Sequence, residues 1–101
     1  MPAKKKSDIL AFVQIVFSVY TDDTPEKFEQ SIKEVPEILS CYNITGEADY
    51  MLVIVSENLE KYEKLLRLTI RRLPGVTSIK SNLSMREVKN TTSLPLSNRK
   101  I

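Results

Sequence analysis

Residues 9–19 alternate between uniformly apolar and mixed positions, and this period of two predicts a β-strand with one fully apolar face. That face carries Ala11, Val13, Ile15, Phe17 and Val19. Residues 38–45 predict a second strand, which contains Ser40 and Asn43 and is closed by Gly46. Residues 50–55 predict a third strand that is apolar on both faces. Residues 76–88 predict a fourth strand with Ile79, Leu83 and Met85 on one face.

Two segments between these strands have helical spacing instead. The first begins with Thr24 as the predicted N-cap and Pro25 at the first helical position, and we expect Pro36 to end it. Its predicted buried stripe is Phe28, Ile32 and Val35. The second helix has Ser56 or Asn58 as its predicted N-cap and ends at Pro74-Gly75. Its predicted buried stripe is Leu59, Tyr62, Leu66, Ile70 and Leu73.

The predicted order, β-α-β-β-α-β, indicates one α+β domain over residues 9–88. Right-handed crossovers in both halves give a ferredoxin-like sandwich with a four-stranded antiparallel sheet in the order 4-1-3-2. This order places the two most apolar strands, residues 9–19 and 50–55, in the middle of the sheet. The two outer strands then carry the polar residues that are typical of sheet edges.

In this topology both helices cover one face of the sheet, and the other face remains open. Phe12, Val16 and three apolar residues of the third strand are expected on that open face. Burying five such side chains contributes ~10 kcal/mol at ~2 kcal/mol each, which is comparable with the whole net stability of a small domain. The sequence therefore predicts a homodimer that packs sheet to sheet, a dimeric α/β barrel. A bare sheet face in a monomer is the alternative.

Composition narrows the classes of function. The chain has 101 residues, a formal net charge of +2, no histidine and one cysteine, Cys41. Five of the cations lie in the tails, in residues 4–6 and 99–100, so direct nucleic-acid binding by the folded part is disfavoured. We expect residues 1–8 to be a flexible basic N-terminus and residues 89–101 to be a tail. No apolar run is long enough to span a membrane, and no signal peptide is recognisable, so a cytoplasmic protein is expected.

A candidate binding site lies at the predicted turn before the third strand. Gly46 permits a positive φ, Glu47 and Ala48 follow, and Asp49 and Tyr50 lead into the apolar run. A free amino acid needs an acceptor for its ammonium group and donors for its carboxylate. Asp49 offers the acceptor, and the backbone N–H groups of residues 46–49 offer the donors. The alternative is that Gly46 only forms the turn and Asp49 only keeps a strand end soluble.

Several short segments of the chain closely resemble one known family. They are residues 39–42 (LSCY), 45–50 (TGEADY), 73–76 (LPGV), 87–92 (EVKNTT) and 94–96 (LPL). Together, in this order and spacing, they resemble the C-terminal effector-binding domain of the Lrp/AsnC transcription regulators, which is also called the RAM domain. The resemblance covers residues 10–96, nearly the whole chain.

This resemblance implies a ferredoxin-like fold that pairs sheet to sheet, and often a tetramer of dimers with eight chains. It implies that small effectors, typically amino acids, bind between subunits near the turn at Gly46 and Asp49. It also places Asn82, Leu83 and Ser84 of the last strand and Leu59 of the second helix in the pocket wall. The Ser84 hydroxyl is then a second candidate donor for an effector carboxylate.

One departure from the family is large, because its regulators carry an N-terminal helix-turn-helix domain and here only eight residues precede the first strand. The chain thus looks like a stand-alone RAM domain that modulates transcription through ligand-dependent assembly or through association with full-length regulators. Met1 favours a complete product over a piece of a longer regulator. No cofactor and no metal site are expected.

Two other functions remain open from the sequence. Dimeric ferredoxin-like sheets also host small enzymes, but the absence of histidine, metal-ligand clusters and a phosphate-binding glycine loop argues against catalysis. Cys41 is expected to be an inert buried thiol. The other hypothesis is an oligomerisation module without a ligand. Residues 91–96 are either a loose tail or a segment that packs along the dimer partner.

Overall fold

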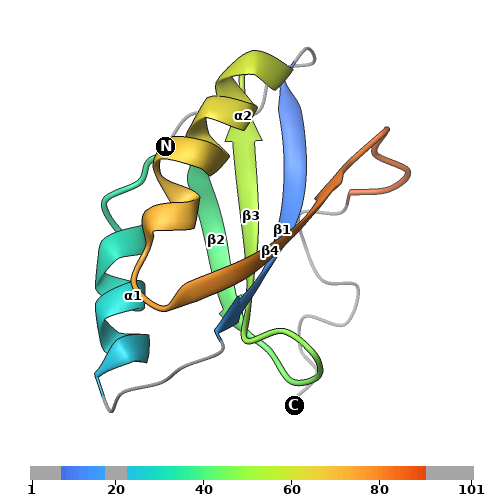
Figure 1. Ribbon diagram of the computed structural model, residues 1–101. Helices are drawn as coiled ribbons and strands as arrows, with labels where there is room; N and C mark the ends of the chain where they lie inside the picture. The colour runs from blue at the N-terminus through green and yellow to red at the C-terminus, as the bar shows by residue number, and fades with distance from the viewer. Residues whose placement is uncertain (1–7, 18–22, 91–101) are drawn as a thin grey trace.

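The computed structural model describes residues 8–17 and 23–90 of the chain. Four strands and two helices follow one another in the predicted order (Figure 1). The strands are β1 (Ile9–Phe17), β2 (Ile38–Asn43), β3 (Tyr50–Ser56) and β4 (Val76–Leu83). The helices are α1 (Thr24–Ile32) and α2 (Leu59–Leu68), and α2 is followed by the short 3₁₀ helix η1 (Ile70–Arg72).

The sheet is antiparallel with the order β2-β3-β1-β4, which is the predicted order 4-1-3-2 counted from the other edge. The two central strands pair from Ile9 with Ser56 to Ile15 with Tyr50. On its other side β1 pairs with β4, from Ala11 with Leu83 to Phe17 with Val76. The ferredoxin-like topology predicted from the sequence is therefore confirmed.

The core lies between the sheet and the helices. Phe28 of α1 packs its ring at 4.6 Å from the Tyr50 ring and 5.2 Å from the Phe17 ring, measured between centroids. Tyr62 of α2 forms a hydrogen bond between its hydroxyl and that of Ser81 in β4. Because Phe17, Tyr50 and Ser81 share one face of the sheet by strand register, both helices cover that face.

Both helices differ from their predicted bounds. Thr24 is the first residue of α1 and not its N-cap, which is Asp23 and makes no side-chain capping bond. The helix ends at Ile32, so Val35 lies beyond it. Helical backbone is disfavoured for a residue that precedes a proline, as Val35 precedes Pro36. The Val35 N–H instead donates to Ile32 O, three residues back.

The second helix is capped as one of the two alternatives predicted. The Asn58 side chain, through its Oδ1, accepts a hydrogen bond of 2.8 Å from the Lys61 N–H. Tyr62, Ile70 and Leu73 are buried as predicted, whereas Leu59 is 49% exposed. Leu59 is the first residue of α2, and its predicted place in the buried stripe is wrong.

The fourth strand is shorter than predicted. It ends at Leu83, and Met85 is 99% exposed. The Ser84 N–H still donates to Leu10 O at 2.8 Å, beyond the last strand pair of Ala11 with Leu83. The predicted extension of this strand to residue 88 is therefore wrong.

The open face of the sheet is apolar, as the alternation predicted, but less exposed than expected. Phe12 is 39% exposed, while Val16, Met51 and Val53 are half-buried. Val55, which the register also places on this face, is only 7% exposed in a single chain. Four of the five predicted side chains are thus left for a partner to cover, together with the half-buried Leu10, which pairs with Val55.

The tails lie outside the described residues. They comprise most of the predicted basic N-terminus, residues 1–7, and the tail from residue 91 onward. The segment 18–22 also lies outside them, including Val19 of the predicted first strand. In the described part of the chain no helix is long and apolar enough to cross a membrane.

Candidate functional site

The turn between β2 and β3 is built around Gly46. Its φ is +110°, a conformation that residues with a side chain rarely adopt, so glycine is favoured at this position. Within the described part of the chain the backbone N–H groups of Gly46, Glu47 and Ala48 donate to no other residue. Gly46 and Glu47 are exposed, and Ala48 is buried. The turn thus presents successive N–H groups that are available to an acceptor.

Asp49 is fixed at the base of this turn by bonds to both neighbouring strands. Its Oδ2 accepts a hydrogen bond of 2.8 Å from the Phe17 N–H, at the point where the β1–β4 register shifts. Its own N–H donates to Ile15 O at 2.8 Å, and its carbonyl accepts from Ile44 N–H and from Asn43 Nδ2. The predicted set of N–H donors therefore loses residue 49, because that N–H is used within the sheet.

These contacts give the Asp49 carboxylate a structural role that the sequence did not reveal. It closes the end of β1 across the sheet, in addition to any contact with a ligand. Asn43, which the sequence marked only as an interruption of the strand, also stabilises the turn. Its amide ties the two arms of the turn together, and an asparagine shortly before a glycine turn is a signal that points to this role.

Tyr50 faces the core rather than the turn surface. It is 4% exposed, its ring contacts the rings of Phe17 and Phe28, and its hydroxyl donates to Glu29 Oε2 at 2.5 Å. The residue therefore supports the site from behind by anchoring the first position of β3 to α1. Of Tyr50, only the backbone therefore remains a candidate for contact with an effector.

The other predicted site residues lie at the opposite end of the sheet. Asn82 and Leu83 end β4, Ser84 follows them, and Leu59 begins α2. Asn82 pairs with Phe12 on the open face, and Leu83, which is 44% exposed, pairs with Ala11 on the helix-covered face.

The length of β3 separates the two groups of predicted site residues. The turn adjoins Tyr50, whereas Leu59 follows the far end of β3 at Ser56. The six residue steps from Tyr50 to Ser56 correspond to about 20 Å. Figure 1 shows the β2–β3 turn at the bottom of the sheet and the start of α2 at its top. One chain does not bring the two groups together.

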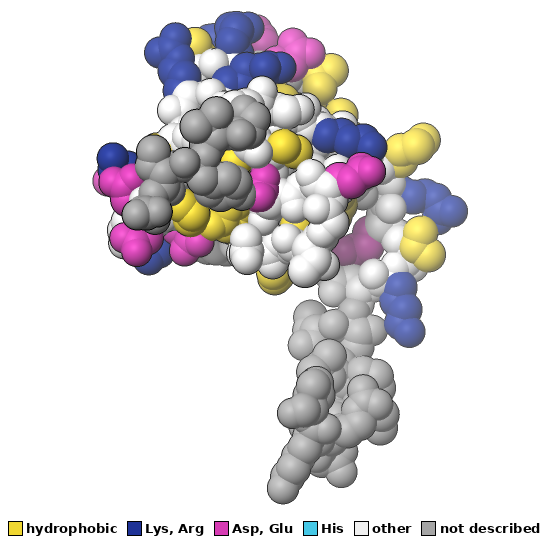
Figure 2. Space-filling model, turned by 60° about the horizontal axis from the view of Figure 1, so that its bottom comes forward, with side chains coloured by type: hydrophobic (Ala, Val, Ile, Leu, Met, Phe, Trp, Pro, Cys, Tyr) yellow, Lys and Arg dark blue, Asp and Glu magenta, His cyan; other side chains and the backbone are white. Residues whose placement is uncertain are grey.

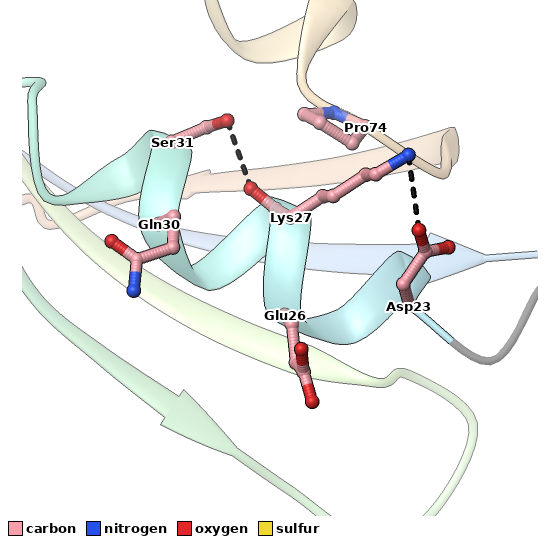
Figure 3. Close-up of a pocket in the computed structure, with 6 residues that line it drawn as sticks. All are labelled: Asp23, Glu26, Lys27, Gln30, Ser31 and Pro74. Atoms are coloured by element: carbon pink, nitrogen blue, oxygen red, sulfur yellow. Dashed lines mark hydrogen bonds and ion pairs between the residues drawn. The ribbon is translucent and has the colours of Figure 1, made fainter.

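A hollow elsewhere on the surface contains none of the predicted residues. It lies between α1 and the turn after η1 and is lined by Asp23, Glu26, Lys27, Gln30, Ser31 and Pro74. Figure 3 shows Lys27 reaching to Asp23, with an ion-pair distance of 3.1 Å, and the Ser31 hydroxyl donating to Lys27 O. Lys27, Asp23 and Ser31 are thus paired locally, and Glu26 and Gln30 point away from them, so the polar groups do not converge on a common point and the hollow is a poor ligand site.

Cys41 lies on the helix-covered face of β2, where it pairs with Leu52. Burial, together with the nearby negative charge of Glu29, raises the pKa of its thiol from 9.0 to about 11. The thiol is therefore protonated at neutral pH, in agreement with the predicted inert cysteine. In the described residues no group of three or more His, Cys, Asp or Glu side chains is placed to hold a metal ion.

Comparison with known proteins gives a consistent result. The family model of the Lrp/AsnC ligand-binding domain matches residues 10–94. The Bkd operon transcriptional regulator of Pseudomonas aeruginosa is 36% identical over 85 residues, covering 84% of this chain and 56% of that protein. The leucine-responsive regulatory protein of Escherichia coli K12 is 32% identical over 93 residues, covering 92% of this chain and 57% of that protein.

A solved structure shows the same similarity. The transcriptional regulator of Neisseria meningitidis in complex with L-Met superimposes with a TM-score of 0.82 at 32% identity, covering 89% of this chain and 58% of that one. The chain thus spans somewhat more than half the length of each of these three relatives.

Proposed function

The chain belongs to the Lrp/AsnC ligand-binding domain family, and from that premise we propose that it binds a free amino acid, or a similar small effector, between its subunits. The relatives are transcription regulators, one of them named leucine-responsive and another solved with L-Met. These names favour an amino acid as the ligand class. No catalytic step is part of the proposal.

The chemistry of the β2–β3 turn supports this ligand class. An α-amino acid carries a carboxylate and an ammonium group a few ångströms apart. The N–H groups of residues 46–48 are donors for the carboxylate, and the Asp49 carboxylate is an acceptor for the ammonium group. Glu47, which is exposed on the same turn, is the residue most free to adapt to different ligands.

The observation that supports a pocket between subunits is the separation of the two groups of predicted site residues. The turn and the group formed by Leu59, Asn82, Leu83 and Ser84 lie at opposite ends of β3. A pocket lined by both groups requires the turn of one copy and the α2–β4 end of another. Leu59 and Leu83 are both exposed by almost half in a single chain, as expected for apolar side chains that a neighbour covers.

We infer a homodimer through the open sheet face, which presents Phe12, Val16, Met51 and Val53. Dimers would then associate further, up to a tetramer of dimers, through the ligand site. A ligand that contacts two subunits stabilises the assembled state by its differential affinity for it. The assembly then modulates transcription, with full-length regulators of the family as the proposed partners and without direct binding of the folded body to nucleic acid.

The function is tested by isothermal titration of the protein with the twenty amino acids. Binding of one amino acid or of a small chemically related group is expected. Leu83→Ala is expected to weaken that binding about tenfold, because a buried leucine contributes roughly 1.5–3 kcal/mol. Val88→Ala, an equally conservative change at another exposed apolar position, is the control. No heat with any amino acid would contradict the proposal.

Analytical ultracentrifugation tests the assembly. Phe12→Lys is expected to produce monomers, because it places a charge in the centre of the sheet-to-sheet contact, whereas Glu63→Lys on the exposed side of α2 is the control. Far-UV circular dichroism of both variants reports whether the fold is intact. A wild-type protein that sediments as a single chain at all concentrations would rule out the intersubunit pocket.

A further inference from the structure

The charged side chains of this chain are divided between its two halves. Residues 23–63 carry ten Asp or Glu against three Lys or Arg. Between Lys64 and Arg86 every charged side chain is Lys or Arg. The small net charge of +2 therefore conceals two segments of opposite charge.

The cations gather at the end of the second helix. Spacing places Lys64, Arg67 and Leu68 on one side of α2, and Arg71 and Arg72 follow in η1. These five residues, all exposed, are called the α2 basic surface. Leu68 is 48% exposed between the cations. The ion pairs of the described residues, Lys27 with Asp23 and Lys61 with Glu57, use none of these five side chains.

An acidic segment follows the first helix. It consists of Glu34, Val35, Pro36 and Glu37, two carboxylates with two apolar residues between them. Glu34 and Pro36 are exposed, and Val35 and Glu37 are half-buried. Figure 2 shows several Lys and Arg side chains along the upper edge, with Asp or Glu beside them, and mainly Asp and Glu side chains at the left.

We propose that the α2 basic surface binds the acidic segment of a second copy of this chain. Arginine forks pair with the two carboxylates, and Leu68 packs against Val35 and Pro36. The α2 basic surface and the acidic segment are complementary in charge and in their alternation of charged and apolar groups. This contact is separate from the open sheet face, because both helices lie on the opposite side of the sheet, so dimers can be joined further through it.

The exposed leucine favours a protein partner over a nucleic acid. A phosphate backbone attracts cations but offers no apolar group at the centre of the contact. Protein interfaces instead combine arginine with apolar side chains at their centre. The contact is also independent of the ligand site, since it uses neither the β2–β3 turn nor the end of β4.

Sedimentation of the wild-type protein and of charge variants tests this contact. Species larger than a dimer are expected in low salt and should diminish at 1 M salt, where the Debye length falls to ~3 Å. Without added amino acid, so that no ligand stabilises assembly through the ligand site, Arg67→Glu with Arg71→Glu is expected to weaken formation of the larger species at least tenfold and to leave dimers. The matched control, Arg86→Glu with Lys89→Glu, makes the same change of charge outside the α2 basic surface and should have no effect.

A charge swap gives the decisive result. Mixing the Arg67→Glu, Arg71→Glu variant with a Glu34→Lys, Glu37→Lys variant should restore the larger species, because the opposite charges are exchanged. Failure of this mixture to assemble, with both variants folded by circular dichroism, would overturn the proposal. So would equal effects of the two basic-residue variants. Binding of an oligonucleotide that depends on Arg67 and Arg71, without any effect on assembly, would assign the surface to nucleic acid instead.

Discussion

Replacing Asp49 by alanine or by asparagine separates its structural role from its proposed role in ligand binding. The carboxylate accepts the Phe17 N–H at 2.8 Å at the end of β1. Asparagine retains an oxygen that can accept this hydrogen bond, whereas alanine leaves the N–H without its partner. The two variants therefore affect stability differently while both remove the negative charge.

The expected magnitudes follow from the chemistry of this bond. A hydrogen bond to a charged group contributes roughly 1.5–3 kcal/mol, and a buried donor left unpaired costs about 1–3 kcal/mol. The contact is partly buried, so Asp49→Ala should lower the free energy of unfolding by about 2 kcal/mol. Asp49→Asn should lower it by less than about 1 kcal/mol, because only the charge assistance is lost.

Ligand binding should be weakened in both variants, because both remove the negative charge. If Asp49 accepts the ammonium group of an amino acid, asparagine weakens binding about 10- to 100-fold, since 1.4 kcal/mol corresponds to a factor of ten. Urea denaturation measures the free energy of unfolding, and isothermal titration measures the affinity. Equal stability losses in the two variants would refute the structural role. An unchanged affinity in a well-folded Asp49→Asn protein would refute the ammonium contact.

Three further predictions concern the fold and the thiol. Gly75→Ala should destabilise the protein by about 2 kcal/mol or more in urea denaturation, because Gly75 has a φ of +82° and an added Cβ would lie 2.4 Å from Thr24 Cγ2. Gly46→Ala, with a φ of +110° and no atom within 4 Å, should cost only the backbone term of about 1 kcal/mol, and equal losses would contradict the steric argument. Asn58→Ala should lower the free energy of unfolding by about 1 kcal/mol through loss of the α2 cap, and an unchanged urea midpoint would count against it. Cys41 should react with iodoacetamide at pH 8 about 100-fold more slowly in the folded protein than in urea, because its pKa is raised from 9.0 to about 11. The free energy of unfolding should correspondingly fall as the pH rises from 9 to 11, because in this range the thiol of the unfolded chain has lost its proton and that of the folded protein has not.

Local patterns were sufficient for most of the fold. The alternation in β1 identified its buried face, and Asn58 was one of two predicted caps of α2. The order of elements, with the handedness of crossovers, then gave the sheet order. These features were accessible because each depends on residues close together in the chain or on a general rule of chain connection.

Most of the wrong predictions concern features that depend on neighbouring elements of the fold. The fourth strand ends at Leu83, short of the predicted residue 88, and Val55 is buried in a single chain although it points to the open face. Neither outcome is encoded in the segment concerned. The early end of α1 at Ile32 is different, because Val35 before Pro36 was a local signal that favoured an earlier stop.

For the candidate site, the sequence by itself determined the residue types and the turn, namely a glycine with positive φ followed by a carboxylate. Only the tertiary structure decided that Asp49 is held by Phe17, that Tyr50 points into the core, and that Leu59 lies at the far end of β3. It likewise decided that the cations of residues 64–72 are exposed. Such relations depend on which segments the sheet and helices bring side by side. The spacing of residues along the chain does not give the distances between segments that are far apart in the sequence.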